Sequence, residues 1–386
     1  MDIENKFPVY GKCNADERAL IERAVSTLYG NIINKPAGDE IFVFKDRKAI
    51  SPSPRTYQGV WNWDSAFHTL AMSYFDIEIA HDQMKILFDF QKPDGQIADV
   101  VYTNGKTVFR FTKPPVLAWA IMKSDMIHPD LSFLEYAYHH LKSNLSWWES
   151  NRFDGTLFSY KVHKMESGWD NTVRFDFPHL IQNCYAVDCN CFMADFYRAM
   201  AYIADKLKQP EEAELYTKKR EKLISKINSI LFSKKDKSYC DYNFKLKRFT
   251  HRLSPASFMP LFCLAADKEK AQCMIEKAKD PNYFYPGIPT ISYNNKRYNS
   301  SKYWRGPCWL NTAYFTIQGL RNYGDFALAD ELTENVLNFC SQNKDSIYEY
   351  YDSKTGKGLG AKDFGWSSAF ILELIKDKYD TRQQLI

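Results

Sequence analysis

Helical periodicity runs through almost the whole chain, and this feature limits the folds that are open to it. Apolar residues recur three and four positions apart in roughly a dozen segments, whereas alternation with a period of two is rare. Segment Ala15–Tyr29 shows the pattern between a suitable N-cap, Asn14, and a suitable stop, Gly30. The same pattern predicts helices over Ser65–Phe75, Ile77–Phe90, Pro115–Ser124, Leu131–Trp148, Val187–Leu207, Glu211–Leu231, Pro255–Ala265, Lys268–Ala278, Cys308–Tyr323, Phe326–Asn343 and Ser367–Lys376.

The predicted helices are of two kinds. Glu211–Leu231 is charged over much of its surface, as an outer helix would be, whereas Cys308–Tyr323 is apolar and aromatic nearly all round, as an inner helix would be. No low-complexity linker divides the chain. We therefore expect an all-α protein, a closed toroid of helical hairpins that forms one domain over residues 1–386, with a small β-hairpin within Tyr239–Arg248. The loops of the inner helices would lie together at one end of the toroid, and we expect a ligand to bind at that end.

Composition argues against several classes of function. With 51 Lys and Arg against 47 Asp and Glu, the net charge of +4 gives no global attraction to nucleic acid or to an anionic membrane. Nine cysteines without a CxxC pair predict neither a zinc site nor a disulfide framework, and they suit a reducing compartment. We see no signal-peptide pattern, and no apolar run approaches the ~18 residues that a membrane span requires. We expect a soluble, cytoplasmic protein that binds no metal, and the oligomeric state stays open.

The segment Met165–Phe175, MESGWDNTVRF, is a candidate functional site. It places two carboxylates, Glu166 and Asp170, around Gly168 and Trp169. Glycine and small polar residues beside a Trp disfavour a helix interior and favour a loop. A carboxylate beside an indole on which a sugar can stack is what acid-catalysed glycoside cleavage requires. Taken alone, the segment fits an ordinary turn with a half-buried Trp equally well.

Two further segments combine aromatic rings with an acid. The first places Trp61 and Trp63 beside Asp64. Asp64 could simply cap the helix that is predicted to follow, but capping does not explain the two flanking Trp residues. The second places Glu349 among tyrosines, where it is either a satisfied acceptor or a base that holds a water molecule. Together the three clusters describe an aromatic pocket with convergent acids, which is typical of carbohydrate chemistry.

The remaining motifs have simple structural interpretations. The turn at Pro93–Gly95 ends one helix, and the prolines 114 and 115 open another. In the segment Tyr303–Asn311, Arg305 could stack on an aromatic ring, bind a carboxylate or form a structural ion pair. Segment Phe364–Ser368 adds one more indole before the last predicted helix.

Taken in order, these segments resemble the motifs of glycoside hydrolase family 63. The matching stretches are Trp63-Asp64, Gln91 to Ile97, Pro114 to Ala120, Glu166 to Phe175, Tyr303 to Trp309, Glu349 to Ala361 and Phe364 to Ser367. The resemblance implies an (α/α)6 barrel, in a clan with trehalase-like barrels, and an inverting, exo-acting α-glycosidase without a cofactor. The chain departs from the pattern at Thr172-Val173 and lacks the N-terminal β-rich domain of the eukaryotic processing glucosidases. It looks closer to compact bacterial members that hydrolyse glucosylglycerate or mannosylglycerate.

The resemblance also assigns catalytic roles, with Asp170 as the general acid and Glu349 as the general base. In such an enzyme the two carboxyl groups lie about 6.5–9.5 Å apart, which leaves room for the attacking water. The substrate would be a small α-glucoside or α-mannoside, such as a disaccharide or a glycosylglycerate. The residues expected to bind it are Trp61, Trp63, Asp64, Gln91, Asp94, Trp119, Glu166, Gly168, Trp169, Asn171, Arg174, Tyr303, Trp304, Arg305, Trp309, Tyr351 and Trp366. Four basic residues could meet a glycerate carboxylate: Lys113, Arg174, Arg305 and Lys362.

Two other classes of function stay open. A sugar isomerase or epimerase on a similar barrel would use histidines as acid and base, and His68 and His163 are the histidines that lie near a motif. Neither has an obvious histidine partner. A catalytically silent carbohydrate-binding protein would use the same aromatic pocket without turnover.

Overall fold

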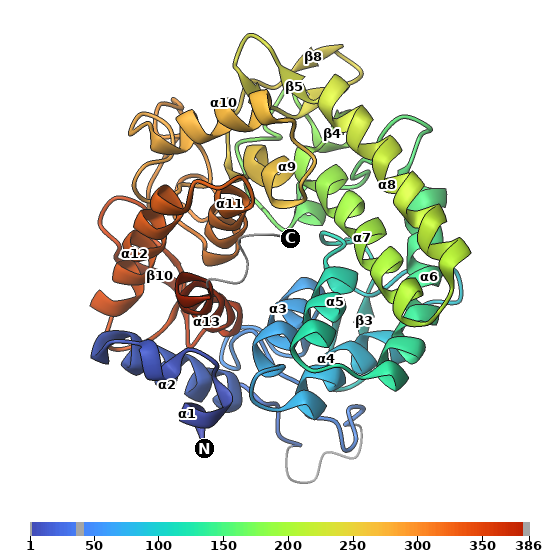
Figure 1. Ribbon diagram of the computed structural model, residues 1–386, viewed down its shortest axis with the longest axis vertical. Helices are drawn as coiled ribbons and strands as arrows, with labels where there is room; N and C mark the ends of the chain where they lie inside the picture. The colour runs from blue at the N-terminus through green and yellow to red at the C-terminus, as the bar shows by residue number, and fades with distance from the viewer. Residues whose placement is uncertain (1, 36–41, 381–386) are drawn as a thin grey trace.

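The structure is a computed structural model that describes residues 2–35 and 42–380, and its helices form a ring (Figure 1). The α-helices are α1 (Ile3–Lys6), α2 (Ala15–Gly30), α3 (Asn62–Met72), α4 (Ile77–Asp89), α5 (Leu117–Ile127), α6 (Leu131–Arg152), α7 (Val187–Lys206), α8 (Pro210–Ile230), α9 (Met259–Phe262), α10 (Lys268–Lys279), α11 (Leu310–Asn322), α12 (Phe326–Gln342) and α13 (Gly365–Tyr379). Short 3-10 turns are η1 (Tyr10–Lys12), η2 (Lys164–Ser167), η3 (Ile181–Asn183) and η4 (Pro255–Phe258).

Strands are short and belong to the loops between the helices. They are β1 (Val60–Trp61), β2 (Val100–Val101), β3 (Thr107–Val108), β4 (Cys184–Tyr185), β5 (Phe232–Ser233), β6 (Ser238–Tyr239), β7 (Tyr242–Asn243), β8 (Arg248–Phe249), β9 (Tyr348–Tyr351) and β10 (Gly358–Lys362). All pairings among them are antiparallel: β1–β2–β3, β4–β7–β8, β5–β6 and β9–β10. The predicted hairpin within Tyr239–Arg248 is present as β7–β8, while Tyr239 itself pairs in the β5–β6 hairpin.

The helices form two concentric layers. Each of the inner helices α3, α5, α7, α9, α11 and α13 contacts the next, and α13 returns to α3 (Figure 1). Every residue of α3 is buried, whereas α8 in the outer layer buries only three residues, Tyr216, Leu223 and Ile227. The outer position of α8 follows from its sequence, because its many charged side chains remain in water. The expected all-α, (α/α)6-type toroid with small β-hairpin insertions is thereby confirmed.

The ring closes where α2 packs against α13 (Figure 1). Asn14 and Glu17 form a capping box that starts α2, as Asn14 was predicted to do. Glu17 also accepts hydrogen bonds of 2.7 Å from both Lys378 and Tyr379 on α13. Polar contacts thus join α2 to α13, two helices from opposite ends of the described chain, where the ring closes.

Two helix predictions need correction. Helix α3 begins at Asn62 with Trp61 as its N-cap, so Asp64 lies inside the first turn and is not the cap that the sequence suggested. The predicted helix Pro255–Ala265 is a 3-10 turn followed by the short helix α9. Pro260 explains the break, since it has no N–H to continue the hydrogen-bond ladder.

Candidate active site

A pocket with a volume of about 60 Å³ lies at the end of the barrel where the inner helices begin. Its walls come from the starts of α3 and α13, the loops before α5 and α11, the segment after η2, and β9. The lining residues are Pro52, Tyr57, Trp61, Trp63, Asp64, Lys113, Gly168, Asp170, Tyr303, Trp304, Glu349, Phe364 and Trp366. Both carboxylates that were expected to be catalytic therefore line the same pocket, although one precedes the middle of the chain and the other lies near its end.

Glu349, on β9, is held by three hydrogen-bond donors. Its Oε1 accepts from the hydroxyls of Tyr57 (3.0 Å) and Tyr303 (3.3 Å), and its Oε2 accepts from the backbone N–H of Ala361 (3.0 Å). Burial raises the pKa of Glu349, while these hydrogen bonds pull the pKa back down. The β9–β10 hairpin is tight here, because a Cβ on Gly360 would lie 2.5 Å from Oε2 of Glu349.

Asp170 has a different environment. Its Oδ1 is buried and has no hydrogen-bond partner in the described part of the chain, and the Lys113 ammonium group lies 4.0 Å from it. Burial raises the pKa of Asp170, and Lys113 opposes that rise. The side chain is 31% exposed, so a ligand in the pocket can reach the carboxyl group. Few donors and partial burial favour the protonated form of this acid.

Gly168 allows the Asp170 loop to approach the Trp63 ring closely. Its φ of 76° lies in the left-handed region, and a Cβ there would be 2.4 Å from the Trp63 ring. Beside that ring, burial raises the pKa of Asp64 well above its usual value. Trp63 and Asp64 thus come from α3 to meet the loop that carries Asp170.

A stack of aromatic rings supports the pocket from behind. Trp304, which lines the pocket, lies between Trp169 (5.3 Å between ring centroids) and Trp309 (3.7 Å). Trp309 then stacks on Tyr350, which precedes Tyr351 on β9. These contacts connect the loops before α7 and α11 to the strand that carries Glu349, so they fix the two acid-bearing segments relative to each other.

Four predicted binding residues instead hold the Asp170 loop. Glu166 is fully buried and accepts hydrogen bonds from Arg152 (2.7 Å) and from the backbone N–H groups of residues 161 and 162. Arg174 is fully buried between Asp188 and Asp241. Asn171 accepts through its Oδ1 from the backbone N–H of Trp304, and Arg305 donates to the Asn171 carbonyl oxygen and to Asp176. These contacts hold the loop, and none of the four residues is in the pocket lining that the described residues form.

Other predicted binding residues lie outside the pocket lining that the described residues form. The amide of Gln91 donates to the carbonyl oxygens of Gly95 and His140, and the exposed Asp94 caps the N–H of Gln96. Trp119 packs among the rings of the inner helices, next to Phe315. Trp169 and Trp309, which stack on Trp304, also lie outside this lining, as does Tyr351, which is fully buried at the end of β9.

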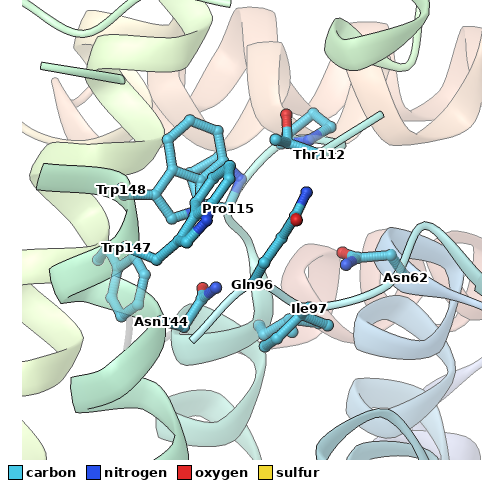
Figure 2. Close-up of a pocket in the computed structure, with 11 residues that line it drawn as sticks. Asn62, Gln96, Ile97, Thr112, Pro115, Asn144, Trp147 and Trp148 are labelled. Carbon is cyan, nitrogen blue, oxygen red and sulfur yellow. The ribbon is translucent and has the colours of Figure 1, made fainter. Parts of the chain in front are cut away.

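The Gln91–Val100 motif lines a separate small cavity. Gln96 lies between Asn62 on one side and Trp147 and Trp148 on the other, and Thr112 lies above it (Figure 2). The cavity has a volume of about 10 Å³, which is roughly the room for one water molecule. This motif therefore packs the loop against α6, in agreement with the structural interpretation of its turn.

Four residues of the pocket lining were not among the predicted site residues: Pro52, Tyr57, Lys113 and Phe364. Tyr57 lies in a proline-containing loop and carries no motif of its own, and Pro52 comes from the same loop. Lys113 was noted only as one of several basic residues. The signal that marks it is its place between Thr112 and two prolines, where the chain turns into α5.

Comparison with known proteins agrees with this geometry. Residues 57–367 match the model of a mannosylglycerate hydrolase MGH1-like glycoside hydrolase domain. Mannosylglycerate hydrolase of Rubrobacter radiotolerans is 24% identical, over 84% of this chain and 92% of the relative. The corresponding enzyme of Thermus thermophilus is also 24% identical, over 83% of this chain and 95% of the relative.

Solved structures share the fold. The crystal structure of GH63 mannosylglycerate hydrolase from Thermus thermophilus in complex with Tris and D-glycerate superposes with a TM-score of 0.77 at 22% identity, covering 92% of this chain and 99% of that one. Neutral trehalase Nth1 from Saccharomyces cerevisiae has a TM-score of 0.68 at 15% identity, covering 92% and 77%. Because the family model covers most of the chain, the resemblance to family 63 is confirmed, and the protein belongs to the MGH1-like glycoside hydrolases, enzymes that hydrolyse glycosidic bonds.

Proposed function

We propose that this protein is an inverting, exo-acting α-glycosidase in which Asp170 is the general acid and Glu349 the general base. The observation that carries the proposal is the contrast between the two carboxyl groups in one pocket. Glu349 accepts three hydrogen bonds, which favour its ionised form, whereas Oδ1 of Asp170 accepts none from the described residues. Burial raises the pKa of both groups, but hydrogen bonds oppose that rise at Glu349 alone, and such a difference in environment is what separates an acid from a base.

The reaction follows from these roles. Asp170 gives its proton to the glycosidic oxygen, and the electrons of the breaking C–O bond go to that oxygen. A water molecule attacks the anomeric carbon from the opposite face and gives its proton to Glu349. The anomeric configuration is inverted, and we expect the two carboxyl groups to lie about 6.5–9.5 Å apart in the substrate complex.

The relatives support a small substrate. The named relatives are mannosylglycerate hydrolases matched over nearly their whole length. We therefore propose an α-mannoside or α-glucoside with a small aglycone, with a glycosylglycerate as the first candidate.

The test is a panel of mannosylglycerate, glucosylglycerate and α-linked disaccharides, followed by NMR so that the first anomer released is seen. We expect the β-anomer of the free sugar. Asp170→Asn and Glu349→Gln should each lower kcat by at least about 10³-fold without lowering the thermal unfolding temperature. Near-normal turnover by both variants, or release of the α-anomer, would contradict the proposal.

The same panel separates the alternatives. An isomerase would convert a free sugar, and a silent binding protein would retain a sugar without turnover. His68, which an isomerase would need, is fully buried, and burial lowers its pKa to about 3. A Cβ on Gly365 would lie 2.2 Å from its Nε2, so the ring is tightly enclosed. This packing favours a structural role for His68.

We further propose that residues 1–386 form a single glycosidase catalytic domain that acts in the cytoplasm on a small carbohydrate, with no nucleic acid or membrane partner. The closed ring of inner helices supports the single domain. All nine cysteines are free thiols and eight of them are buried, which suits a reducing compartment. Over residues 2–35 and 42–380, we find no helix with the length and apolar character needed to cross a bilayer.

A further inference from the structure

Lys113 is the one cationic side chain among the described residues that line the pocket. It is 5% exposed, and its φ of 54° is in the left-handed region that residues with a side chain seldom adopt. Such backbone strain persists only where the surroundings hold it, and it is concentrated at functional sites. Lys113 also directly precedes the two prolines that lead into α5, so its backbone has little freedom.

The ammonium group of Lys113 has three neighbours. Nζ donates a hydrogen bond of 3.1 Å to the carbonyl oxygen of Met165, in the same loop as Asp170. It lies 3.6 Å from Oδ1 of Asp99 and 4.0 Å from Oδ1 of Asp170. A single cation thus bridges the candidate acid and a second, more deeply buried carboxylate.

Asp99 is a rigid anchor for this bridge. Its backbone N–H donates to Val108, and its carbonyl oxygen accepts from Asn62 at the start of α3. It is 4% exposed, and its Oδ1 has no hydrogen-bond partner within residues 2–35 and 42–380. The mechanism proposed above gives no role to this buried acid, yet its charge faces the lysine next to Asp170.

We propose that Lys113, held in place by Asp99, is a positioning residue that stabilises the carboxylate formed when Asp170 gives its proton to the leaving group. This inference rests on the proposed function. As the proton leaves, the negative charge appears on Asp170 about 1 Å beyond hydrogen-bonding distance from a fixed ammonium group. That charge is stabilised more in the transition state than in the ground state, where Asp170 is neutral. Asp99 offsets part of the lysine charge, so that Asp170 is not ionised prematurely.

Other charged groups near this bridge are few. His163 and Lys164, from the same loop, also act on Asp170, and Lys164 is paired with Asp176 at 3.4 Å. Asp64 faces Lys113 from α3. Across the pocket lies Glu349 with Tyr57 and Tyr303, and the charge of Asp170 acts on it. Burial raises the pKa of Asp99 to about 6, so this carboxyl group also titrates within the pH range of an activity profile.

The test compares the pH dependence of kcat for Lys113→Met and Asp99→Asn on the best substrate of the panel. Loss of the lysine charge should let Asp170 keep its proton to higher pH, so the alkaline limb moves up by about one pH unit while kcat at the optimum falls about tenfold. Loss of the Asp99 charge should move the same limb down. Opposite shifts from two neighbouring substitutions are the expected signature.

Two controls accompany these variants. Lys113→Arg keeps the charge and should keep the alkaline limb within about 0.3 pH unit of its normal position. Lys164→Met removes a positive charge from the same loop, but that charge is already paired with Asp176, so the limb should hardly move. Thermal unfolding of each variant shows whether a loss of kcat reflects a loss of fold.

Three results would overturn the inference. A fall in kcat for Lys113→Met and Lys113→Arg alike, with no shift of the limb, would mean a structural role. A change confined to KM for substrates with an anionic aglycone would mean that Lys113 binds the aglycone. Shifts of the same sign in Lys113→Met and Asp99→Asn would exclude the bridge. If Asp170→Asn itself retains activity, the proposed function fails, and that outcome is visible independently of the Lys113 variants.

Discussion

The Tyr57 hydroxyl donates a hydrogen bond of 3.0 Å to Oε1 of Glu349, joining a loop that precedes the first strand to a strand near the end of the chain. Tyr303 donates to the same oxygen from a third segment. Burial raises the pKa of Glu349, and the hydroxyl groups act against that rise. The backbone N–H of Ala361 and the two phenols thus favour the ionised form of this buried carboxylate, which is the form that the proposed base requires.

Replacing Tyr57 with Phe should make Glu349 a poorer base at low pH. With one donor gone the pKa of Glu349 rises, so the acidic limb of kcat/KM should move up by about 0.5–1 pH unit. Stability should change little, because the ring still packs edge-on against Trp61. Tyr348→Phe is the matched control, since the Tyr348 hydroxyl donates to Asp345 at the surface. An acidic limb that stays in place would contradict this role for Tyr57.

Replacing Gly168 with Ala should disrupt the contact between the Asp170 loop and Trp63. The new Cβ would meet the indole at 2.4 Å in a left-handed conformation. We expect kcat to fall at least about 100-fold, because a displacement of about 1 Å in a catalytic group has this effect. Gly155→Ala is the control: Gly155 also has a positive φ, but a Cβ there meets nothing within 4 Å. Equal activity of the two variants would show that the contact does not position the acid.

Replacing Arg174 with Met should destabilise the fold strongly. Two buried carboxylates, Asp188 and Asp241, would lose their common partner, and breaking a buried ion pair from one side costs about 3–5 kcal/mol. Urea denaturation measures the loss in the free energy of unfolding. Arg297→Ala removes a pair with Asp176 whose arginine is 49% exposed, and it should cost no more than about 1 kcal/mol. Similar losses in both variants would contradict this assignment.

The buried Asp99 should make the protein less stable as pH rises. Its pKa is raised from an ordinary value of 3.8 to about 6, so the folded chain binds this proton more tightly than the unfolded chain. The free energy of unfolding therefore falls between about pH 4 and pH 6. Asp99→Asn should remove this fall and be more stable than the parent at pH 7, by on the order of 2 kcal/mol.

Urea denaturation of the parent and of Asp99→Asn at pH 4, 5, 6 and 7 measures this difference. The gap between them should open as pH rises and should vanish near pH 4. A constant gap at every pH would mean that the substitution acts through packing rather than through the charge of Asp99.

Much of the fold is predictable because inner and outer helices differ in composition. Helix α11 is buried nearly throughout and α8 hardly at all, and each was predicted within a few residues of its observed bounds. The error at Asp64 arises because an acidic residue before an apolar run is favoured both at the N-cap and within the first turn of a helix. The local sequence cannot distinguish these positions, since the observed N-cap, Trp61, makes no capping hydrogen bond with its side chain.

The site is predictable only in part. Motifs indicate Asp170 and Glu349 as the candidate catalytic residues, and both line the pocket. However, residues of one motif lie in different places. Gly168 and Asp170 line the pocket, whereas Glu166 and Arg174 are buried and paired with other side chains. Which way each side chain points depends on residues far along the chain, such as Asp241 for Arg174. Tyr57 could not be identified for the same reason, because its role exists only once β9 has been placed beside it.

The contact between α2 and α13 has a consequence for biosynthesis. Glu349, Phe364 and Trp366 all arrive with the last hairpin of the ring, after the loop that carries Asp170 has long been made. A nascent chain therefore lacks part of the pocket wall until α13 docks between α3 and α2. The pocket in this architecture is complete only when the ring of inner helices has closed, because its lining residues come from segments spread around that ring.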